Sequence, residues 1–210
     1  DFKTMWIYLK DSSDYFLSRI SVSMFTSSNV FVLGIFSSNS IVGYFSVAEK
    51  LYNGLRSLYG PISGTLYPYI AKERNIHLYK KIFYSVVCFN IVTVILLWWF
   101  APKVIELISG EYLEISISFF RILIVFAIFT VPSSLLGYSF LAALGFKNYA
   151  NNSVIIASLV HVSGLLLLSL FNQINAYNVI YMIAISEFIV LIIRVYGIIK
   201  HKLWITTKII

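Results

Sequence analysis

The sequence has few charged residues and almost no cysteine. Only 12% of its 210 residues are Asp, Glu, Lys or Arg, against about 25% in an average soluble domain. With 59% apolar residues and a mean hydropathy of +0.84, a soluble domain of this size could not bury its apolar surface. The single cysteine, Cys88, excludes a disulfide framework and a cysteine-based metal site, and we expect it to be a small buried side chain. These shortages exclude a soluble enzyme, a disordered protein and a disulfide-built secreted scaffold.

The sequence also lacks the motifs of soluble enzymes. It contains no G-x-G-x-x-G, no phosphate-binding G-K-[ST] loop, no H-E-x-x-H and no G-x-S-x-G. The three histidines, His77, His161 and His201, lie in different segments and predict no metal site. We therefore expect no cofactor. Because His161 lies in the middle of an apolar run, we expect a hydrogen-bonded core histidine rather than a proton relay.

Long apolar runs fill the sequence instead. A bilayer core of about 30 Å requires about 20 mostly apolar helical residues, and six runs are candidates for such helices. They are 15–36, 41–70, 82–100, 117–144, 154–171 and 177–199. The runs are continuous and lack the two-residue alternation of membrane β-barrels. The sequence therefore predicts an all-α polytopic membrane protein with six transmembrane helices.

Lys and Arg are unevenly distributed among the segments between these runs. The net charge is +7, and in a chain this apolar such charge orients helices in a membrane rather than binding nucleic acid. With six spans both chain ends lie on one side, and the segments there carry ten Lys or Arg, against only Lys103 on the other side. We therefore expect both ends and residues 72–81 in the cytoplasm, and residues 37–40, 101–116 and 172–176 on the outer side.

Four charged residues lie deep inside the predicted spans. At 1.5 Å per residue, Glu49 and Lys50 lie about 12 and 14 Å into the second span, Arg56 about 22 Å, and Glu187 about 15 Å into the sixth. Exposing all four to lipid would cost on the order of 10 kcal/mol. We therefore expect them to face protein or water.

Three arginines lie closer to the ends of spans. Arg19 and Arg121 lie within about two turns of an end, where a long side chain can reach the membrane surface; a place in a polar cavity is the alternative. Arg194 is near the cytoplasmic end of the sixth span, and we interpret it as a positive-inside anchor; a place among the buried charges of the cavity is the alternative.

The second span has one polar face. At 100° per residue, seven polar or small residues fall within about 100° of arc. They are Ser46, Glu49, Asn53, Arg56, Gly60, Ser63 and Tyr67. Gly60-Pro61 predicts a kink in this helix, and Pro132 predicts another in the fourth span.

Two interpretations of the polar face remain open. In the first, Glu49 pairs with a basic neighbour, Glu187 pairs with Arg56 or Lys50, and these pairs simply hold the bundle together. In the second, the face lines a hydrated cavity whose net positive charge suits an anion such as a phosphate or pyrophosphate. The candidate cavity-lining residues are Arg56, Lys50, Glu49, Asn53, Arg19, Tyr67, Glu187 and Arg121.

Residues 17–72 carry several sequence blocks in a fixed order. They read SxxxFT-SSN-xFxLG-F, then VGYFSVAEK, then PIS-xx-LYPYIAK. These blocks resemble the Wzx-type O-antigen and polysaccharide flippases, which belong to a larger group with the MATE antiporters and lipid II flippases. The resemblance is strong over about residues 1–100 and follows only the hydropathy pattern after that.

The resemblance implies a fold and a function. It implies that residues 1–210 form the C-terminal six-helix lobe of a two-lobe transporter, with an N-terminal lobe before Asp1. The implied substrate is an undecaprenyl-pyrophosphate-linked oligosaccharide, which crosses the bacterial inner membrane by alternating access through a cationic cavity. The implied partners are this substrate, membrane lipids, the N-terminal lobe and the polysaccharide polymerase machinery.

Other functions remain as alternatives. A lipid II flippase would also need to bind pyrophosphate, whereas a cation-coupled drug antiporter would need an acidic cavity. A membrane-embedded polysaccharide polymerase or ligase usually needs a large periplasmic loop, and the segment 101–116 is short and has no His or Arg. A purely structural subunit is the remaining alternative.

Overall fold

The computed structural model describes residue 16 and residues 20–21, 23–24 and 27–205. Most of these residues are helical, and none of them lies in a strand. The helices are Ser27–Phe36, α2 (Asn39–Ser57), α3 (Gly60–Glu73), α4 (Ile76–Trp99), α5 (Ala101–Ser109), α6 (Glu114–Leu136), the π-helix η1 (Gly137–Ala142), α7 (Lys147–Leu170) and α8 (Ala176–Lys200). The expected all-α architecture is confirmed for this part of the chain.

Four helical segments are long and apolar enough to cross a membrane. They are Ile76–Trp99, Glu114–Ala142, Lys147–Leu170 and Ala176–Lys200, and they correspond to the predicted spans 82–100, 117–144, 154–171 and 177–199. The predicted span 41–70 is divided between α2 and α3. The structure fits a polytopic membrane protein, and six spans stay a prediction.

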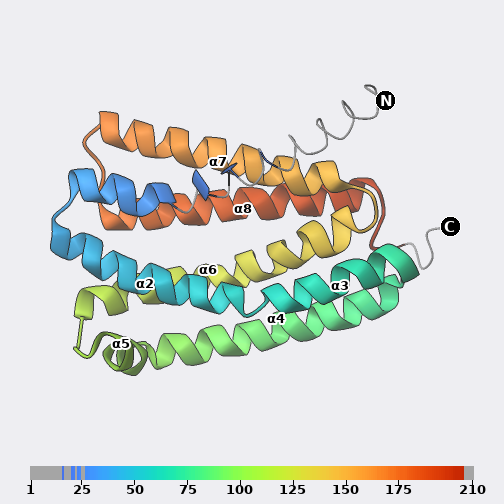
Figure 1. Ribbon diagram of the computed structural model, residues 1–210, viewed down its shortest axis with the longest axis horizontal. Helices are drawn as coiled ribbons and strands as arrows, with labels where there is room; N and C mark the ends of the chain where they lie inside the picture. Colours follow the sequence, from blue (N-terminus) through green and yellow to red (C-terminus); the bar gives the residue numbers. More distant parts are fainter. Residues whose placement is uncertain (1–15, 17–19, 22, 25–26, 206–210) are drawn as a thin grey trace.

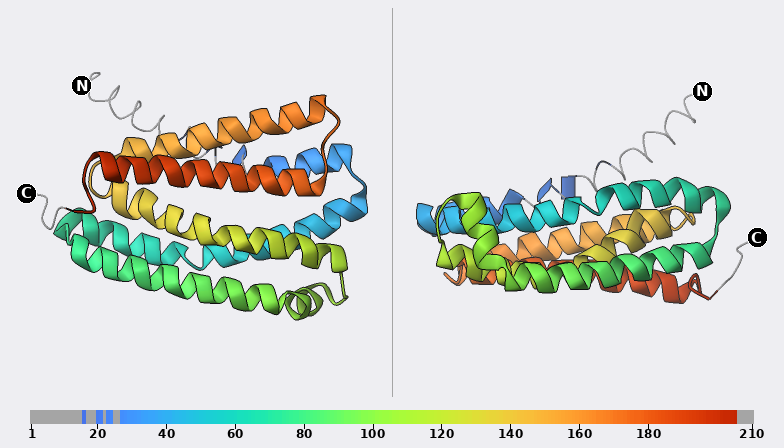
Figure 2. Two further views of the ribbon diagram at one scale, coloured as in Figure 1. Left: turned by 180° about the vertical axis from the view of Figure 1, so that it is seen from behind. Right: turned by 90° about the horizontal axis from the view of Figure 1, so that it is seen from below.

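Apart from the short α5, which Figure 1 shows end-on, the helices run roughly along one long axis and reverse direction at two ends. The connections at 37–38, 110–113 and 171–175 lie at one end, together with α5, which carries Lys103 (Figures 1 and 2). The connections at 74–75 and 143–146 lie at the other end, where α8 also finishes. The predicted topology requires this division, whereas the side of the membrane on which each end lies stays a prediction.

Helix α6 is the centre of the bundle. It packs against α2, α4, α5 and α8, and more than half of its most apolar stretch is buried, whereas α4 buries only 11% of its own. A helix that is apolar all round but exposed needs lipid or another helix against it. Cys88, which we expected to be buried, is exposed on α4, because most of that helix faces outward.

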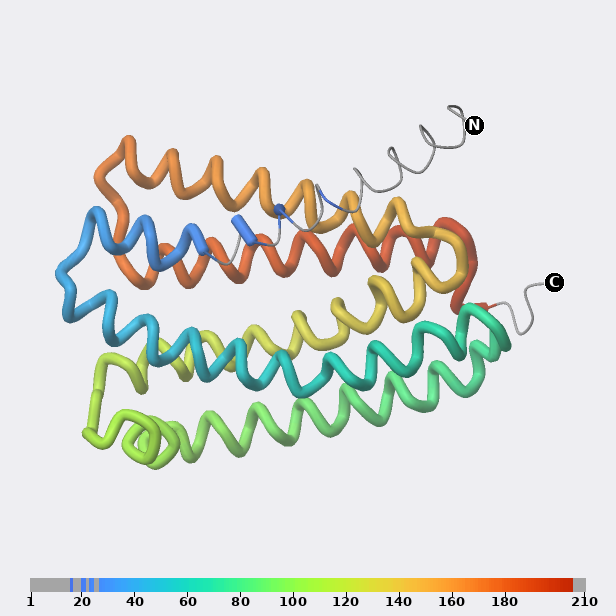
Figure 3. The backbone as a smooth tube through the Cα atoms, in the orientation of Figure 1, coloured from blue at the N-terminus to red at the C-terminus, as the bar shows by residue number. Residues whose placement is uncertain are grey.

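The kink predicted at Gly60-Pro61 is a complete break between two helices. Helix α2 ends at Ser57 and α3 begins at Gly60, and the backbone changes direction there (Figure 3). Pro61 lies in the first turn of α3, where a missing backbone N–H removes no helical hydrogen bond. The single kinked helix expected over 41–70 is therefore two helices.

The second predicted kink takes another form. Pro132 lies inside α6 without ending it, and α6 continues to Leu136 before the chain becomes the π-helix η1. The backbone N–H of Ala143 donates to the carbonyl of Tyr138, five residues earlier, at 3.2 Å. Wider helical turns of this kind occur frequently at functional sites. The segment 101–116, expected to be a loop, contains the nine-residue helix α5.

Candidate functional site

A cavity of about 1240 Å³ lies between the broken α2–α3 pair and the helices α6–η1, α7 and α8. Polar or charged side chains from all of these elements line it. They include Asn53, Arg56, Ser57, Ser63, Tyr67, Thr130, Ser133, Ser134, Tyr138, Lys147, Asn151, Ser158, Glu187 and Arg194. The cavity therefore collects polar groups inside a bundle whose outer surface is largely apolar.

The polar face expected on the second span supplies one wall of this cavity. The lining includes five members of this face, Asn53, Arg56, Gly60, Ser63 and Tyr67. Residues spaced at 100° therefore face the cavity on both sides of the break. A side-chain carbon added at Gly60 would meet nothing within 4 Å. The break thus leaves open space beside the first turn of α3.

Arg56 and Glu187 form an ion pair across the cavity. Arg56 Nη2 lies 2.8 Å from Glu187 Oε1, and the guanidinium also lies over the ring of Tyr52, 5.4 Å from its centroid. The Glu187 side chain is 7% exposed and that of Arg56 is 30% exposed. Of the two partners considered for Glu187, Arg56 and Lys50, the structure pairs it with Arg56.

Arg194 forms part of the cavity wall. Its interpretation as an anchor at the membrane surface did not predict this position. Its residue is only 5% exposed, and its guanidinium donates three hydrogen bonds. Nη1 donates to the carbonyl of Ser133 at 2.6 Å, Nε to Ser153 Oγ at 3.0 Å, and Nη2 to the carbonyl of Ala150 at 3.5 Å. The interpretation of Arg194 as a surface anchor is therefore wrong.

The guanidinium of Arg194 fits because residue 137 is a glycine. A side-chain carbon at Gly137 would lie 2.7 Å from Arg194 Cζ, which is too close for unbonded atoms. We refer to Ser133, Gly137, Ala150 and Ser153 as the Arg194 socket. The socket forms where α6 gives way to η1, and its acceptors come from α6 and α7.

One sequence signal could have placed Arg194 in the site. Glu187 and Arg194 are seven residues apart, so at 3.6 residues per turn they lie about 20° apart on the same face of α8. Because Glu187 lies deep in the span, its face of α8 should point into the protein. Arg194 lies on the same face, so it should point inward as well. The three acceptors in the socket have no such signal, because two of them are backbone carbonyls.

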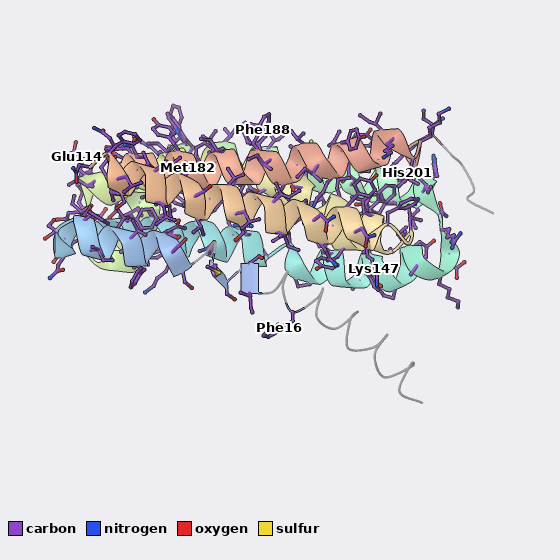
Figure 4. All side chains as sticks on the ribbon, turned by 90° about the horizontal axis from the view of Figure 1, so that it is seen from above. Phe16, Glu114, Lys147, Met182, Phe188 and His201 are labelled. Atoms are coloured by element: carbon purple, nitrogen blue, oxygen red, sulfur yellow. The ribbon has the colours of Figure 1, made fainter. Side chains whose placement is uncertain are left out.

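Basic groups outnumber acidic groups in the lining. The described lining contains Arg56, Lys147 and Arg194 but only one carboxylate, Glu187. Lys147 lies at the same end of the bundle as His201 and opposite Glu114 (Figure 4). Arg56 is paired with Glu187, whereas Arg194 donates to the neutral oxygens of Ser133, Ala150 and Ser153. A buried cation without a carboxylate favours the binding of an anion.

Glu49 belongs to a different polar cluster. Its Oε1 accepts a hydrogen bond from Asn29 Nδ2 at 2.9 Å, and Asn29 Oδ1 lies 2.9 Å from His161 Nε2. His161 Nδ1 lies 3.1 Å from Ser186 Oγ and 3.3 Å from the carbonyl of Met182. The expectation of a hydrogen-bonded core histidine is thus confirmed for His161, and Glu49 lies outside the cavity lining.

Three other candidates do not contribute to the described lining. Lys50 is exposed on α2 and lies outside the cavity. Arg121 also lies outside it: its Nε donates to the carbonyl of Trp98 at 3.3 Å, and its guanidinium lies 4.9 Å from the centroid of that indole. Arg19 lies outside the described residues. Of the eight candidates, the structure brings together Arg56, Asn53, Tyr67 and Glu187 in the described cavity.

Comparison with known proteins finds one matching family model and a distant relative of this chain. Residues 2–74 match a family model described as "Polysaccharide biosynthesis protein". The resemblance to polysaccharide flippases is confirmed for this region. A relative from Escherichia coli (strain K12), named "Putative O-antigen transporter", is 29% identical over 90 residues, which cover 40% of this chain and 21% of the relative. The chain thus matches about a fifth of that relative's length, and no solved structure matches it.

The comparisons and the helices agree on the broad class. A relative named as a transporter and a family of polysaccharide biosynthesis proteins point to a transporter rather than an enzyme. Four apolar helices of membrane-spanning length point to a multi-pass membrane protein. The matched region contains the described part of the first helix, α2 and α3, so it includes one wall of the cavity.

Proposed function

We propose that this chain is one lobe of a transporter that moves an undecaprenyl-pyrophosphate-linked oligosaccharide across the bacterial inner membrane. The observation that carries the proposal is the cavity whose described lining contains Arg56, Lys147 and Arg194 and one carboxylate, Glu187. The match to polysaccharide biosynthesis proteins supplies the class of cargo. The second lobe, the surrounding lipids and the polymerase that receives the exported units are the partners in this proposal.

The chemistry of the substrate explains the need for such a cavity. A pyrophosphate and its sugars cannot cross hydrocarbon, because burying an unpaired charge or an unsatisfied hydroxyl costs several kcal/mol (roughly 2–7 for a hydroxyl). A polyprenyl tail can remain in the lipid. The protein therefore has to hold only the head: guanidinium groups bind phosphate oxygens in a fork, and Asn53, Asn151 and Tyr67 offer hydrogen bonds or a ring surface to sugars.

The break between α2 and α3 supports a moving site. Broken helices near the middle of a membrane are typical of transporters, and the positive end of the second half-helix favours anionic groups. The first turn of α3 lines the cavity through Gly60 and Ser63, and no side chain caps its first N–H groups. In the proposed mechanism, this break and the π-helix η1 absorb the rocking of one lobe against the other.

Two alternatives make different predictions about the head group. A lipid II-type flippase or another exporter of the MATE-like group would use the same charges for a different cargo. A polymerase or ligase would need groups for acid–base chemistry on the outer side. In that region the described segment 101–116 offers Lys103 and three glutamates but no His or Arg. Export of a defined polysaccharide from a strain that lacks its own flippase separates these functions.

The proposal is tested with Arg56→Gln in the full-length protein that contains this chain. We expect surface polysaccharide to fall by at least about tenfold, because one charge-assisted contact to a phosphate accounts for about 1.5–3 kcal/mol. Arg56→Lys should restore part of the export if a point charge is sufficient. Lys50→Gln is the matched control, since Lys50 lies on the same helix but outside the cavity. Normal export by Arg56→Gln at normal abundance would contradict the proposal.

A further inference from the structure

The two arginines of the cavity are held in different ways. Arg194 donates only to neutral oxygens in its socket, and Gly137 leaves room for its guanidinium. Arg56 lies against the carboxylate of Glu187 at 2.8 Å. A phosphate that enters the cavity therefore meets one guanidinium held by neutral oxygens, that of Arg194, and another that is paired with a carboxylate, that of Arg56.

The ion pair joins two helices that otherwise have little contact. Helix α2 packs mainly on α6, and α6 packs on α8, so α2 and α8 face each other chiefly across the cavity. The Arg56–Glu187 pair crosses this space, and both residues belong to the lining. A ligand in the cavity can therefore reach the pair without breaking the main packing of either helix.

Glu187 has a second cation on its own helix. It shares one face of α8 with Arg194, about 10.5 Å along the axis at 1.5 Å per residue. If its contact with Arg56 is lost, the carboxylate still faces a positively charged wall. Displacement of Glu187 therefore does not leave it in apolar surroundings without a cation.

A carboxylate and a phosphate compete for the same guanidinium geometry. Both accept two parallel N–H bonds from an arginine fork. A carboxylate carries one negative charge, whereas a pyrophosphate carries more charge and more acceptor oxygens. A singly charged anion thus gains little by replacing Glu187 at Arg56, and a pyrophosphate gains more.

We propose that Glu187 is a resident counter-anion that the substrate's pyrophosphate displaces from Arg56, so that the cavity selects multiply charged head groups over singly charged anions. This inference rests on the proposed function, because it uses the same site and the same class of substrate. Before the substrate binds, Glu187 neutralises Arg56 and bridges the space between α2 and α8. In the loaded cavity, the pyrophosphate takes its place.

The test uses the purified full-length protein and inorganic pyrophosphate as the probe, with acetate as the singly charged comparison. Glu187→Gln removes the competing charge. We expect this variant to bind pyrophosphate about tenfold more tightly than the wild type, because a close ion pair has a coupling of at least that size. It should also prefer pyrophosphate over acetate less strongly. Glu106→Gln is the control, since Glu106 is exposed on α5 and lies outside the lining, and the affinity of this variant should equal that of the wild type.

A double-mutant cycle separates displacement from a general gain in positive charge. In the Arg56→Gln background, Glu187→Gln should no longer change the affinity for pyrophosphate. A tenfold gain that persists without Arg56 would overturn the inference, because Glu187 would then act on the whole cavity. Equal or weaker binding by Glu187→Gln alone would also overturn it.

A milder variant covers the possibility that Glu187→Gln does not fold. Glu187→Asp keeps the charge and withdraws the carboxylate by one methylene, so pyrophosphate should bind about threefold more tightly as the pair weakens. Unchanged binding by this variant would overturn the inference. The wild type tests the proposed function separately. If the wild type does not bind pyrophosphate, the proposed site itself is contradicted. If it binds and no Glu187 variant changes the affinity, only the displacement is contradicted.

Discussion

Arg194 and Arg121 lie at almost the same distance from the end of a helix, yet their surroundings are opposite. Arg194 lies six residues before the end of α8 and Arg121 seven residues after the start of α6, which is about 9 and 10.5 Å at 1.5 Å per residue. Arg194 is buried in its socket, whereas Arg121 is partly exposed against Trp98. Distance from a helix end therefore does not decide whether an arginine is buried.

The difference comes from the neighbouring helices. Both arginines donate to a carbonyl in the last turn of another helix, Ser133 of α6 for Arg194 and Trp98 of α4 for Arg121. Carbonyls at the C-terminal end of a helix attract cations, and the carbonyl of Ser133 accepts from Arg194 in addition to the backbone N–H of Gly137. Only Arg194 has in addition a glycine that leaves room for it and two acceptors on α7. These additions convert a surface contact into a buried site.

The largest expected effect is that of Arg194→Met. This change leaves three acceptors in the socket without their charged donor, and each lost hydrogen bond to a charged group costs about 1.5–3 kcal/mol. We expect a marked fall in the thermal unfolding temperature of the purified full-length protein and a loss of export. Arg121→Met is the comparison variant. If both substitutions lower the unfolding temperature equally, the socket does not distinguish the two arginines.

The next effect is that of Gly137→Ala. The added carbon would lie 2.7 Å from Arg194 Cζ, so the guanidinium would have to move, and overpacking of this kind costs about 1–3 kcal/mol. Gly43→Ala is the control, because a carbon there meets nothing within 4 Å and α2 is helical at this point. We expect the control to be neutral or stabilised by about 0.5–1 kcal/mol. Equal unfolding temperatures for the two variants would show that the socket can relax.

A smaller effect should follow from Ser153→Ala. Ser153 Oγ accepts from Arg194 Nε at 3.0 Å and donates to the carbonyl of Ala150 at 2.9 Å. We expect a loss of about 0.5–1.5 kcal/mol, because Arg194 keeps its hydrogen bonds to two backbone carbonyls. Ser163→Ala on the same helix is the control, since its hydroxyl is exposed and bonds only within α7. Thermal unfolding measures both. An unchanged unfolding temperature for Ser153→Ala would mean that the backbone carbonyls alone hold Arg194.

The fold was predictable to the extent that hydropathy determines it. Four apolar runs became helices of spanning length, because the single proline within them, Pro132, does not end α6. The break at residues 58–59 was foreseen only as a kink, since Pro61 is equally compatible with a bend and with a new first turn. The π-helix η1 has no signal in the sequence, and it packs against α3, α7 and α8, which are contacts that sequence spacing does not encode.

The candidate site was predictable along single helices and not between them. The periodicity of the second span placed Asn53, Arg56 and Tyr67 on one face, and all three line the cavity. Arg194 was misjudged because its partners lie on α6 and α7, and two of them are backbone carbonyls. Sequence spacing describes a helix face, whereas contacts between helices depend on packing that spacing does not encode.

The smallest expected effect is that of Arg121→Gln. The side chain makes one hydrogen bond at 3.3 Å and one contact with an indole ring, and exposed contacts of these kinds contribute about 0.5–1 kcal/mol. Glutamine retains a donor and the apolar stem but loses the charge. We therefore expect an unfolding temperature within a few degrees of the wild type and normal export of polysaccharide. A loss of export at normal abundance would place Arg121 in the transport pathway after all, and the contrast with Arg194 would then concern burial but not function.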